Sequence, residues 1–299
     1  GMGGSAIGGD LIRSYASHWT ATPIEVVRNY SLPNYVGPKT LVICSSYSGN
    51  TEETLSCFDI AKSRKAQIFA ISTGGKLQDL CKLDSIPCLE IPGGLQPRAA
   101  LGYSFMPLLV FFESQGWIPD QKEAIQSLYE ILQEEKNENS FSISSDSCPT
   151  KKIALTLQNK FPVIYVGQDT FQPIGARWQA QFNENAKNFA HNFVLPEMNH
   201  NEILGWSHPS ELIKNFHVLM LMDEDYHPQT KKRFEIVKKL IQSNCAGITV
   251  IPSKGKTLLA RLFSFLSLGD FISVYLAYLN QQDPTPIPAI DHLKRELAK

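Results

Sequence analysis

The chain has 299 residues, of which 43% are hydrophobic and 19% are charged, and its formal net charge at pH 7 is −1. It has neither the basic excess of a nucleic-acid-binding protein nor an apolar run near the roughly 20 residues that a membrane span needs, so we expect no nucleic-acid and no membrane partner. Six cysteines without a CxxC pair, in a chain that opens without a signal peptide, predict reduced thiols and a cytoplasmic protein.

The first part of the chain alternates short β-branched segments with longer amphipathic ones, which favours a parallel sheet covered by helices. We expect strands at residues 24–29, 40–46, 66–73 and 86–92, and helices at residues 5–18, 51–65, 76–82, 97–115 and 120–135. A glycine-rich opening such as GMGGSAIGGD normally follows a strand. We therefore expect that a strand upstream of it is missing from the first sheet.

The second part repeats this alternation after a polar, serine-rich segment at residues 136–150, where we place a linker. Residues 1–135 would form the first domain and residues 151–299 the second. The expected elements of the second domain are strands at residues 161–167, 216–223 and 247–252, helices near 150–160, 173–190, 228–244 and 256–281, and a short C-terminal helix. Both halves are therefore predicted to be α/β and doubly wound.

The most distinctive stretch is SSYSGNTEET, which places hydroxyls between an expected strand and an expected helix. Ser46, Ser48 and Thr51 would lie beside the free N–H groups at the start of that helix, a place that suits a small phosphomonoester. The alternative is an ordinary helix cap, because Asn50 and Glu53 have the spacing of a capping box. The residues alone leave both interpretations open.

The glycine-rich opening offers a second set of contacts. Gly3 and Gly4, followed by Ser5, would let backbone N–H groups approach substrate oxygens closely. A dinucleotide-binding loop has similar glycine spacing, but it needs an acidic residue at the end of the second strand. Here that segment ends in Arg28 and Asn29, so we do not expect a bound dinucleotide.

The stretch SSYSGNTEETL resembles the phosphate-binding segment of sugar isomerase (SIS) domains. Together with GMGGSAIGGD, QPRAALGYSF, FNENAK, LPEMNHNEILGW and IDHLKRELAK, it makes the chain similar from end to end to the bifunctional phosphoglucose/phosphomannose isomerase family. The resemblance implies two SIS-type doubly wound domains, each a mainly parallel sheet flanked by helices. It also implies that glucose 6-phosphate and mannose 6-phosphate are converted to fructose 6-phosphate through an enediol, without a metal or a cofactor.

Moving a carbonyl between C1 and C2 of a sugar phosphate needs a base, a ring-opening group and a cation near the enediolate. By resemblance the base is Glu184, which would otherwise be an exposed helix glutamate. His200, with an unperturbed pKa of ~6.5, is by resemblance the ring-opening residue, supplied by the partner subunit of a homodimer. The alternatives for His200 are a metal site with Glu202 and His208, or an ordinary surface histidine.

Two cationic residues complete the predicted site. Arg98, at an expected helix start, would hold the enediolate or orient the base through its paired N–H donors. Lys294 matches the active-site lysine of the family. Without the resemblance, both would be ordinary surface residues.

Two other function classes stay open. A non-catalytic sugar-phosphate sensor would keep the hydroxyl segment, but it would not need Glu184, His200 and Lys294 together. Such proteins usually carry a helix-turn-helix or another appended domain, which this sequence does not show. An amino-sugar isomerase without its glutaminase domain would share the hydroxyl segment but have different downstream segments.

Overall fold

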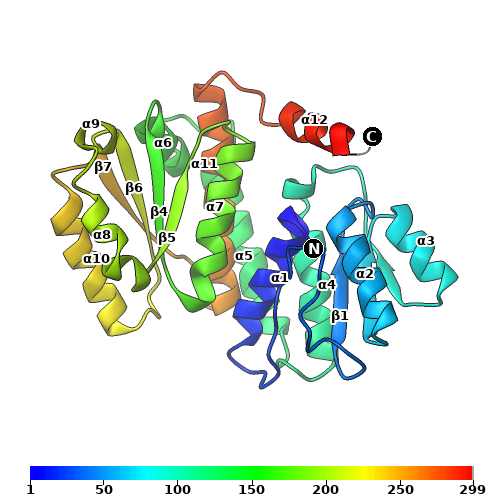
Figure 1. The fold of residues 1–299 in the computed structure, drawn as a ribbon. Coiled ribbons are helices and arrows are strands. Elements are labelled where there is room, and N and C mark those ends of the chain that lie inside the picture. Colours follow the sequence, from blue (N-terminus) through cyan, green and yellow to red (C-terminus); the bar gives the residue numbers. More distant parts are fainter. Residues whose placement is uncertain (298–299) are drawn as a thin grey trace. The chain divides into compact units, whose positions relative to one another are not determined.

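The computed structural model describes residues 1–297, apart from the side chain of residue 169. The chain divides into two compact units, Gly1–Gln121 and Lys122–Lys299, and each contains a parallel sheet with flanking helices (Figure 1). The expected α/β class with parallel sheets is therefore confirmed.

The sheet of the first unit has the strand order β1-β2-β3, and all pairings are parallel. Its strands are β1 (Leu41–Ser45), β2 (Gln67–Ser72) and β3 (Cys88–Glu90). Cys44 and Ala70 are neighbours in the register, and they form one buried cluster with Phe58 and Leu77 of the covering helices. Strands covered in this way read as continuous apolar runs, which is why the sequence predicts them well.

The strand expected at residues 24–29 is not formed, and this segment has no regular secondary structure. Its valines pack against helices instead. Val27 joins a core cluster with Leu32 and Cys57, and a Cβ on Gly9 would lie 3.4 Å from a methyl group of Val26. The β-branched residues that predicted a strand are therefore used for packing rather than for pairing.

The helices of the first unit are α1 (Gly3–Ala16), α2 (Glu52–Ser63), α3 (Gly75–Leu83), the 3-10 helix η1 (Pro97–Ala99) and α4 (Leu101–Ser114). Helices α1 and α4 cross closely because Gly8 has no side chain: a Cβ there would lie 2.8 Å from Ser104 Oγ. The same pair buries Leu11, Phe105 and Leu109 completely. This packing places η1, directly before α4, against the start of α1.

The sheet of the second unit has the order β5-β4-β6-β7, again with parallel pairings. Its strands are β4 (Phe161–Gly167), β5 (His191–Leu195), β6 (Phe216–Met222) and β7 (Gly247–Pro252). Strands β4, β6 and β7 confirm the strands expected there. Strand β5 was not expected, because it is a short edge strand that opens with the polar residues His191 and Asn192.

The helices of the second unit are α5 (Lys122–Asn139), α6 (Pro149–Leu157), η2 (Asp169–Phe171), α7 (Gln172–Glu184), η3 (Glu197–His200), α8 (Glu202–Gly205), α9 (Ser210–Ile213), α10 (Pro228–Ile241), α11 (Leu258–Leu279) and α12 (Pro288–Leu297). Within residues 1–297, only α11 is long and apolar enough to cross a membrane. However, 67% of its apolar window is buried inside the protein. Trp178 donates its indole N–H to Phe265 O at 2.8 Å, which fixes α7 against this core helix.

Helix α5 belongs to the second unit, although the sequence places most of it in the first domain. It packs along α11, and Lys254 Nζ lies 3.4 Å from Glu135 Oε1 and 2.6 Å from Glu138 Oε2. The compact units therefore divide after Gln121. The expected linker, residues 136–150, contains the end of α5 and a series of turns in the second unit, and surface turns have the same polar composition as a linker.

Candidate active site

The hydroxyl segment forms a tight turn between β1 and α2. Ser46 is only 2% exposed, and its Oγ lies 2.8 Å from Thr51 Oγ1. Thr51 is the N-cap residue of α2, but its side chain makes no capping hydrogen bond. The first N–H groups of α2, which have no partner within the helix, are therefore not covered by the side chain of the cap.

The capping box expected from Asn50 and Glu53 is not formed. Asn50 accepts a hydrogen bond from Lys76 N at 3.1 Å and donates one to Ser48 O at 3.1 Å. Its side chain therefore ties the turn to the start of α3. The spacing predicted a cap, but this contact with a segment distant in sequence takes the side chain away from α2.

A second turn, residues 73–75, holds the hydroxyl turn in place. Thr73 donates to Tyr47 O through both its N–H, at 3.1 Å, and its Oγ1, at 2.7 Å. Gly49 has φ +68°, and a Cβ there would lie 1.8 Å from Gly74 O. Only glycine fits this close approach, so the turn has a well-defined shape before any ligand binds.

The start of α1 lies beside the hydroxyl turn. Tyr47 N donates to Ser5 Oγ at 3.2 Å, and a Cβ on Gly4 would lie 2.9 Å from Pro97 O. The free N–H groups at the start of α1 are thus close to those at the start of α2, and two positive helix ends favour an anion.

Arg98 belongs to the same part of the first unit. It lies in η1, next to the Pro97 carbonyl that approaches Gly4, and only 6% of it is exposed. Its guanidinium Nη1 is 3.5 Å from Gln96 Oε1, to which it donates. The alternative of an ordinary surface arginine is therefore wrong.

Glu184 is the last residue of α7 in the second unit, and it is half-buried. Its neighbours are held by hydrogen bonds to other segments. Asn183 Oδ1 accepts from Ala190 N at 3.2 Å, and Asn185 Nδ2 donates to Ser273 Oγ at 2.9 Å. The carboxylate therefore starts from a fixed backbone, as a positioned base requires.

His200 ends η3, directly after the carboxyl end of β5, and it is exposed. Helix α7 runs antiparallel to β5, so Glu184 lies near the opposite, amino end of that strand (Figure 1). The five residues of β5 span about 13 Å at ~3.3 Å each. Within one copy of the second unit, the structure does not bring Glu184 and His200 together.

Lys294 lies on α12, none of whose described residues is buried. Two apolar residues of the same helix, Ile290 and Leu293, are 39% and 57% exposed. Lys294 is therefore a solvent-exposed residue on an amphipathic helix.

Sequence reasoning missed a group of residues around Glu202. Glu202 Oε1 accepts from Tyr165 OH at 2.5 Å, and Glu202 Oε2 lies 2.8 Å from His191 Nε2. The hydrogen bond to Glu202 raises the pKa of His191. Both carboxylate oxygens of Glu202 are occupied, and in the part of the chain that the structure describes no three His, Cys, Asp or Glu side chains are grouped to hold a metal. The metal alternative for His200, Glu202 and His208 is therefore not supported.

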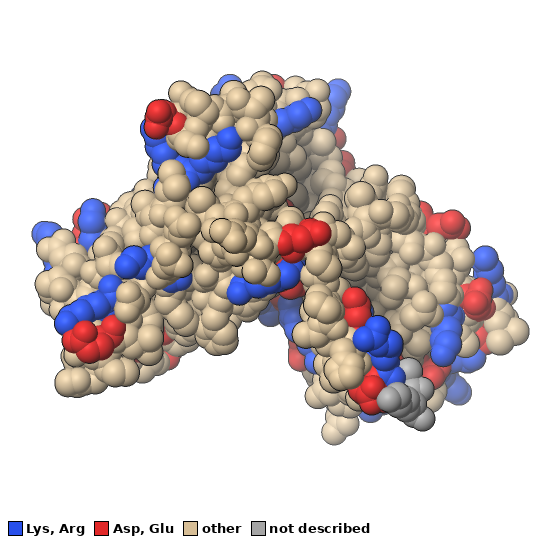
Figure 2. All heavy atoms as spheres, turned by 90° about the horizontal axis from the view of Figure 1, so that it is seen from above, with Lys and Arg blue, Asp and Glu red and all other residues tan. Residues whose placement is uncertain are grey.

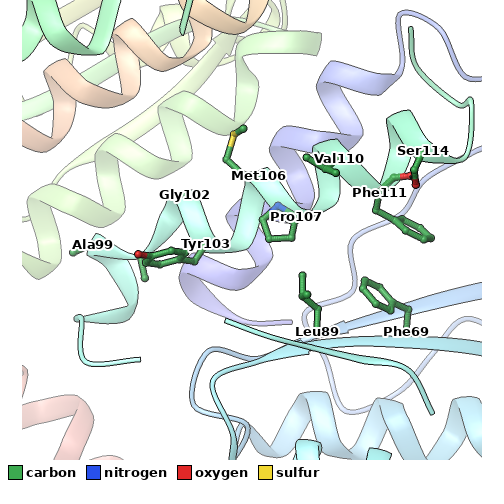
Figure 3. Close-up of a pocket in the computed structure, with 11 residues that line it drawn as sticks. Phe69, Leu89, Ala99, Gly102, Tyr103, Met106, Pro107, Val110, Phe111 and Ser114 are labelled. Atoms are coloured by element: carbon green, nitrogen blue, oxygen red, sulfur yellow. The ribbon is translucent and has the colours of Figure 1, made fainter. Parts of the chain in front are cut away.

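A cavity of about 740 Å³ lies in the first unit, between the outer face of α4 and strands β2 and β3 (Figure 3). Pro107 and Phe111 on α4 face Leu89 and Phe69, and the two phenylalanine rings stack with centroids 5.1 Å apart. The lining of this cavity includes none of the predicted site residues. Because an apolar lining offers little to compensate the desolvation of a phosphate, this cavity is not the phosphate site.

Charged side chains of both signs are mixed on one face of the protein (Figure 2). On the face drawn in Figure 2, lysine and arginine side chains are interspersed with aspartate and glutamate. The described residues of this face therefore offer no broad basic field that would attract an anion.

Residues 147–297 match the family described as bacterial phospho-glucose isomerase C-terminal SIS domain. The bifunctional phosphoglucose/phosphomannose isomerase of Caldicellulosiruptor bescii is 44% identical over 299 residues, which is 100% of this chain and 88% of that protein. Its counterpart from Aquifex aeolicus is 37% identical over 305 residues, with coverage of 100% and 89%. The crystal structure of glucosamine-6-phosphate deaminase from Thermotoga maritima shares the fold, with a TM-score of 0.69 and 15% identity over 94% of this chain and 85% of that one. Because the 44% identity extends over the whole chain, this protein belongs to the bifunctional phosphoglucose/phosphomannose isomerase family.

Proposed function

We propose that the protein interconverts glucose 6-phosphate, and also mannose 6-phosphate, with fructose 6-phosphate. The observation that carries this proposal is the 44% identity, over the whole chain, to a protein named for both isomerase activities. Glucose and mannose differ only at C2, and both give the same cis-enediol. One base therefore serves both sugars if the substrate can turn between its faces.

The phosphate is held by the hydroxyl turn. Ser46, Ser48 and Thr51 supply hydroxyl donors, and the N–H groups of Gly3, Gly4 and Ser5 supply backbone donors. The support is the 2.8 Å pairing of the Ser46 and Thr51 hydroxyls and the hydrogen bond from Tyr47 N to Ser5 Oγ, which joins the two segments. This neutral cradle relies on hydrogen bonds and helix ends rather than on a lysine.

The proton transfer is assigned to Glu184. In the open-chain aldose it removes the proton from C2 while O1 gains a proton, which gives the enediol. It then delivers the proton to C1 while O2 loses its proton, which leaves the ketose. Arg98 and Lys294 stabilise the negative charge that develops on O1 and O2. His200 opens the ring by moving a proton from O1 to the ring oxygen.

The finer features implied by the resemblance are part of the proposal. The first unit is also an SIS-type domain, and the protein acts in the cytoplasm, as a homodimer and without a metal or cofactor. His200 acts on the substrate held by its partner subunit. Its distance from Glu184 supports this, since the two residues lie at opposite ends of β5 in one copy.

The test is a coupled assay for fructose 6-phosphate, started separately from glucose 6-phosphate and mannose 6-phosphate. We expect turnover of both sugars by the wild type and a loss of at least about 100-fold in kcat for Glu184→Gln. Glu211→Gln is a matched control, because Glu211 is an exposed helix glutamate whose carboxylate pairs with Lys214 at 2.6 Å. Equal losses in both variants would refute the role of Glu184.

The sensor alternative gives a different result in the same experiment. A wild type that binds the sugar phosphates in calorimetry without converting them would be a sensor. A wild type that neither binds nor converts them would refute the assignment of the hydroxyl turn to phosphate.

A further inference from the structure

The loop that carries His200 is attached to the sheet of the second unit by a chain of hydrogen bonds. Two residues after His200, the Glu202 carboxylate accepts from Tyr165 OH at 2.5 Å and lies 2.8 Å from His191 Nε2. Trp206 Nε1 then donates to Tyr165 OH at 2.8 Å. The Tyr165 hydroxyl therefore joins both ends of α8 to strand β4.

The anchor of this chain lies deep in the protein. Tyr165 is 0% exposed in the inner strand β4, and Trp206 is 6% exposed. Burial, together with the charge of Glu202, raises the pKa of Tyr165. The tyrosine therefore stays protonated and donates to Glu202 throughout the working pH range. A charge-assisted hydrogen bond of this kind is stronger than a neutral one.

The residues before His200 are held as well. Met198 is completely buried, and Arg233 donates to Asn199 Oδ1 at 3.3 Å. His200 itself is exposed. The backbone of His200 is thus held on both sides, while the residue itself stays exposed.

We propose that Tyr165 and Glu202 are positioning residues that hold His200 in place for ring opening. This inference rests on the proposed function. Glu202 lies close to His200 in the sequence NHNEI, and both of its oxygens are already occupied within the protein. Its contribution is to fix the backbone of the histidine two residues earlier.

The main test uses Tyr165→Phe, which removes the hydroxyl and keeps the ring. We expect kcat to fall about 10- to 100-fold, because small displacements of a catalytic group have effects of this size. We expect KM for the sugar phosphate to change less than about twofold, since the proposed phosphate contacts are elsewhere. Tyr275→Phe is the matched control: Tyr275 is also buried in the second unit, and its hydroxyl donates to Asn139 O.

A double-mutant cycle separates positioning from a general effect on folding. In a His200→Ala background, we expect Tyr165→Phe to change kcat by less than about twofold, because the residue that it positions is gone. Losses that multiply in the double variant, or an equal loss in Tyr275→Phe, would overturn the proposal. If Tyr165→Phe does not fold, Glu202→Gln takes its place in the cycle, since it keeps the shape of the side chain.

Two controls distinguish this proposal from the proposed function. An inactive wild type, or a His200→Ala variant with wild-type kcat, would refute the role of His200 itself and the inference with it. The imidazole NMR signals of His200 give a measurement that needs no turnover. They should shift in Tyr165→Phe and not in Tyr275→Phe, and unchanged signals in Tyr165→Phe would overturn the positioning role while the isomerase function stands.

Discussion

Replacing Gly49 by alanine tests whether the hydroxyl turn is held in one shape. Gly49 has φ +68°, and its added Cβ would lie 1.8 Å from Gly74 O, far inside van der Waals contact. The turn at residues 73–75 would have to move away. That movement would strain the two hydrogen bonds from Thr73 to Tyr47 O.

The expected cost is the sum of two effects. An alanine in the left-handed region costs about 1–2 kcal/mol, and losing two hydrogen bonds costs about 1 kcal/mol each. Gly49→Ala should therefore destabilise the protein by about 3–4 kcal/mol. Gly116→Ala isolates the first effect, because Gly116 has φ +69° and nothing within 4 Å of its Cβ position. That control should cost only about 1–2 kcal/mol.

The assay is urea unfolding followed by circular dichroism, together with KM for glucose 6-phosphate. We expect Gly49→Ala to lower the unfolding midpoint more than Gly116→Ala and to raise KM, whereas Gly116→Ala leaves KM unchanged. If the two variants lose the same stability and keep the same KM, the contact between the two turns does not constrain the phosphate site.

Three other variants test separate parts of the structure. Ser46→Ala should raise KM for the sugar phosphates about 10- to 100-fold, because one hydrogen bond to a charged group contributes a free energy of that size. An unchanged KM in steady-state kinetics would show that Ser46 does not contact phosphate. Gly269→Ala should cost about 1–3 kcal/mol in thermal unfolding by overpacking, because its Cβ would lie 2.4 Å from Trp178 Nε1. Glu202 raises the pKa of His191 above its value in the unfolded chain. The stabilisation from this pair is therefore complete below about pH 6.5 and is lost as the pH rises through the pKa of His191 in the folded protein. His191→Gln should therefore reduce the fall in unfolding midpoint between about pH 6 and 8, and an unchanged profile would contradict this.

Much of the fold could be predicted from local sequence patterns. Strands β1, β2, β4 and β7 contain β-branched residues within short, mainly apolar runs, and β6 is an almost continuous apolar run. The predictions of secondary structure and domain boundary were wrong where tertiary packing overrides the local sequence pattern. Residues 24–29 have strand composition but pack against helices, and β5 begins with polar residues at a sheet edge. Helix α5 packs on α11, so the polar turns after it do not mark the division between the compact units.

The candidate site was predictable only in part. The density of hydroxyls in SSYSGNTEET indicated an unusual turn, and the structure pairs Ser46 with Thr51. The contact of Ser5 with Tyr47 N depends on how distant segments fold together, as does the use of Asn50 to hold α3. No spacing rule links Tyr165 to Glu202, because these residues come from different elements of the second unit.

The two sheets differ at the edge where ligands of doubly wound folds usually bind, at the carboxyl ends of the strands. In the first unit this edge carries the hydroxyl turn. In the second, the N–H of Gly167 at the end of β4 donates to Tyr226 OH at 2.8 Å, and a Cβ on Gly167 would lie 2.5 Å from the tyrosine ring. Beyond β6, Arg261 Nε donates to the buried Asp223 at 2.9 Å. Protein groups thus occupy this edge of the second sheet, which supports the proposal that the phosphate binds at the hydroxyl turn of the first sheet.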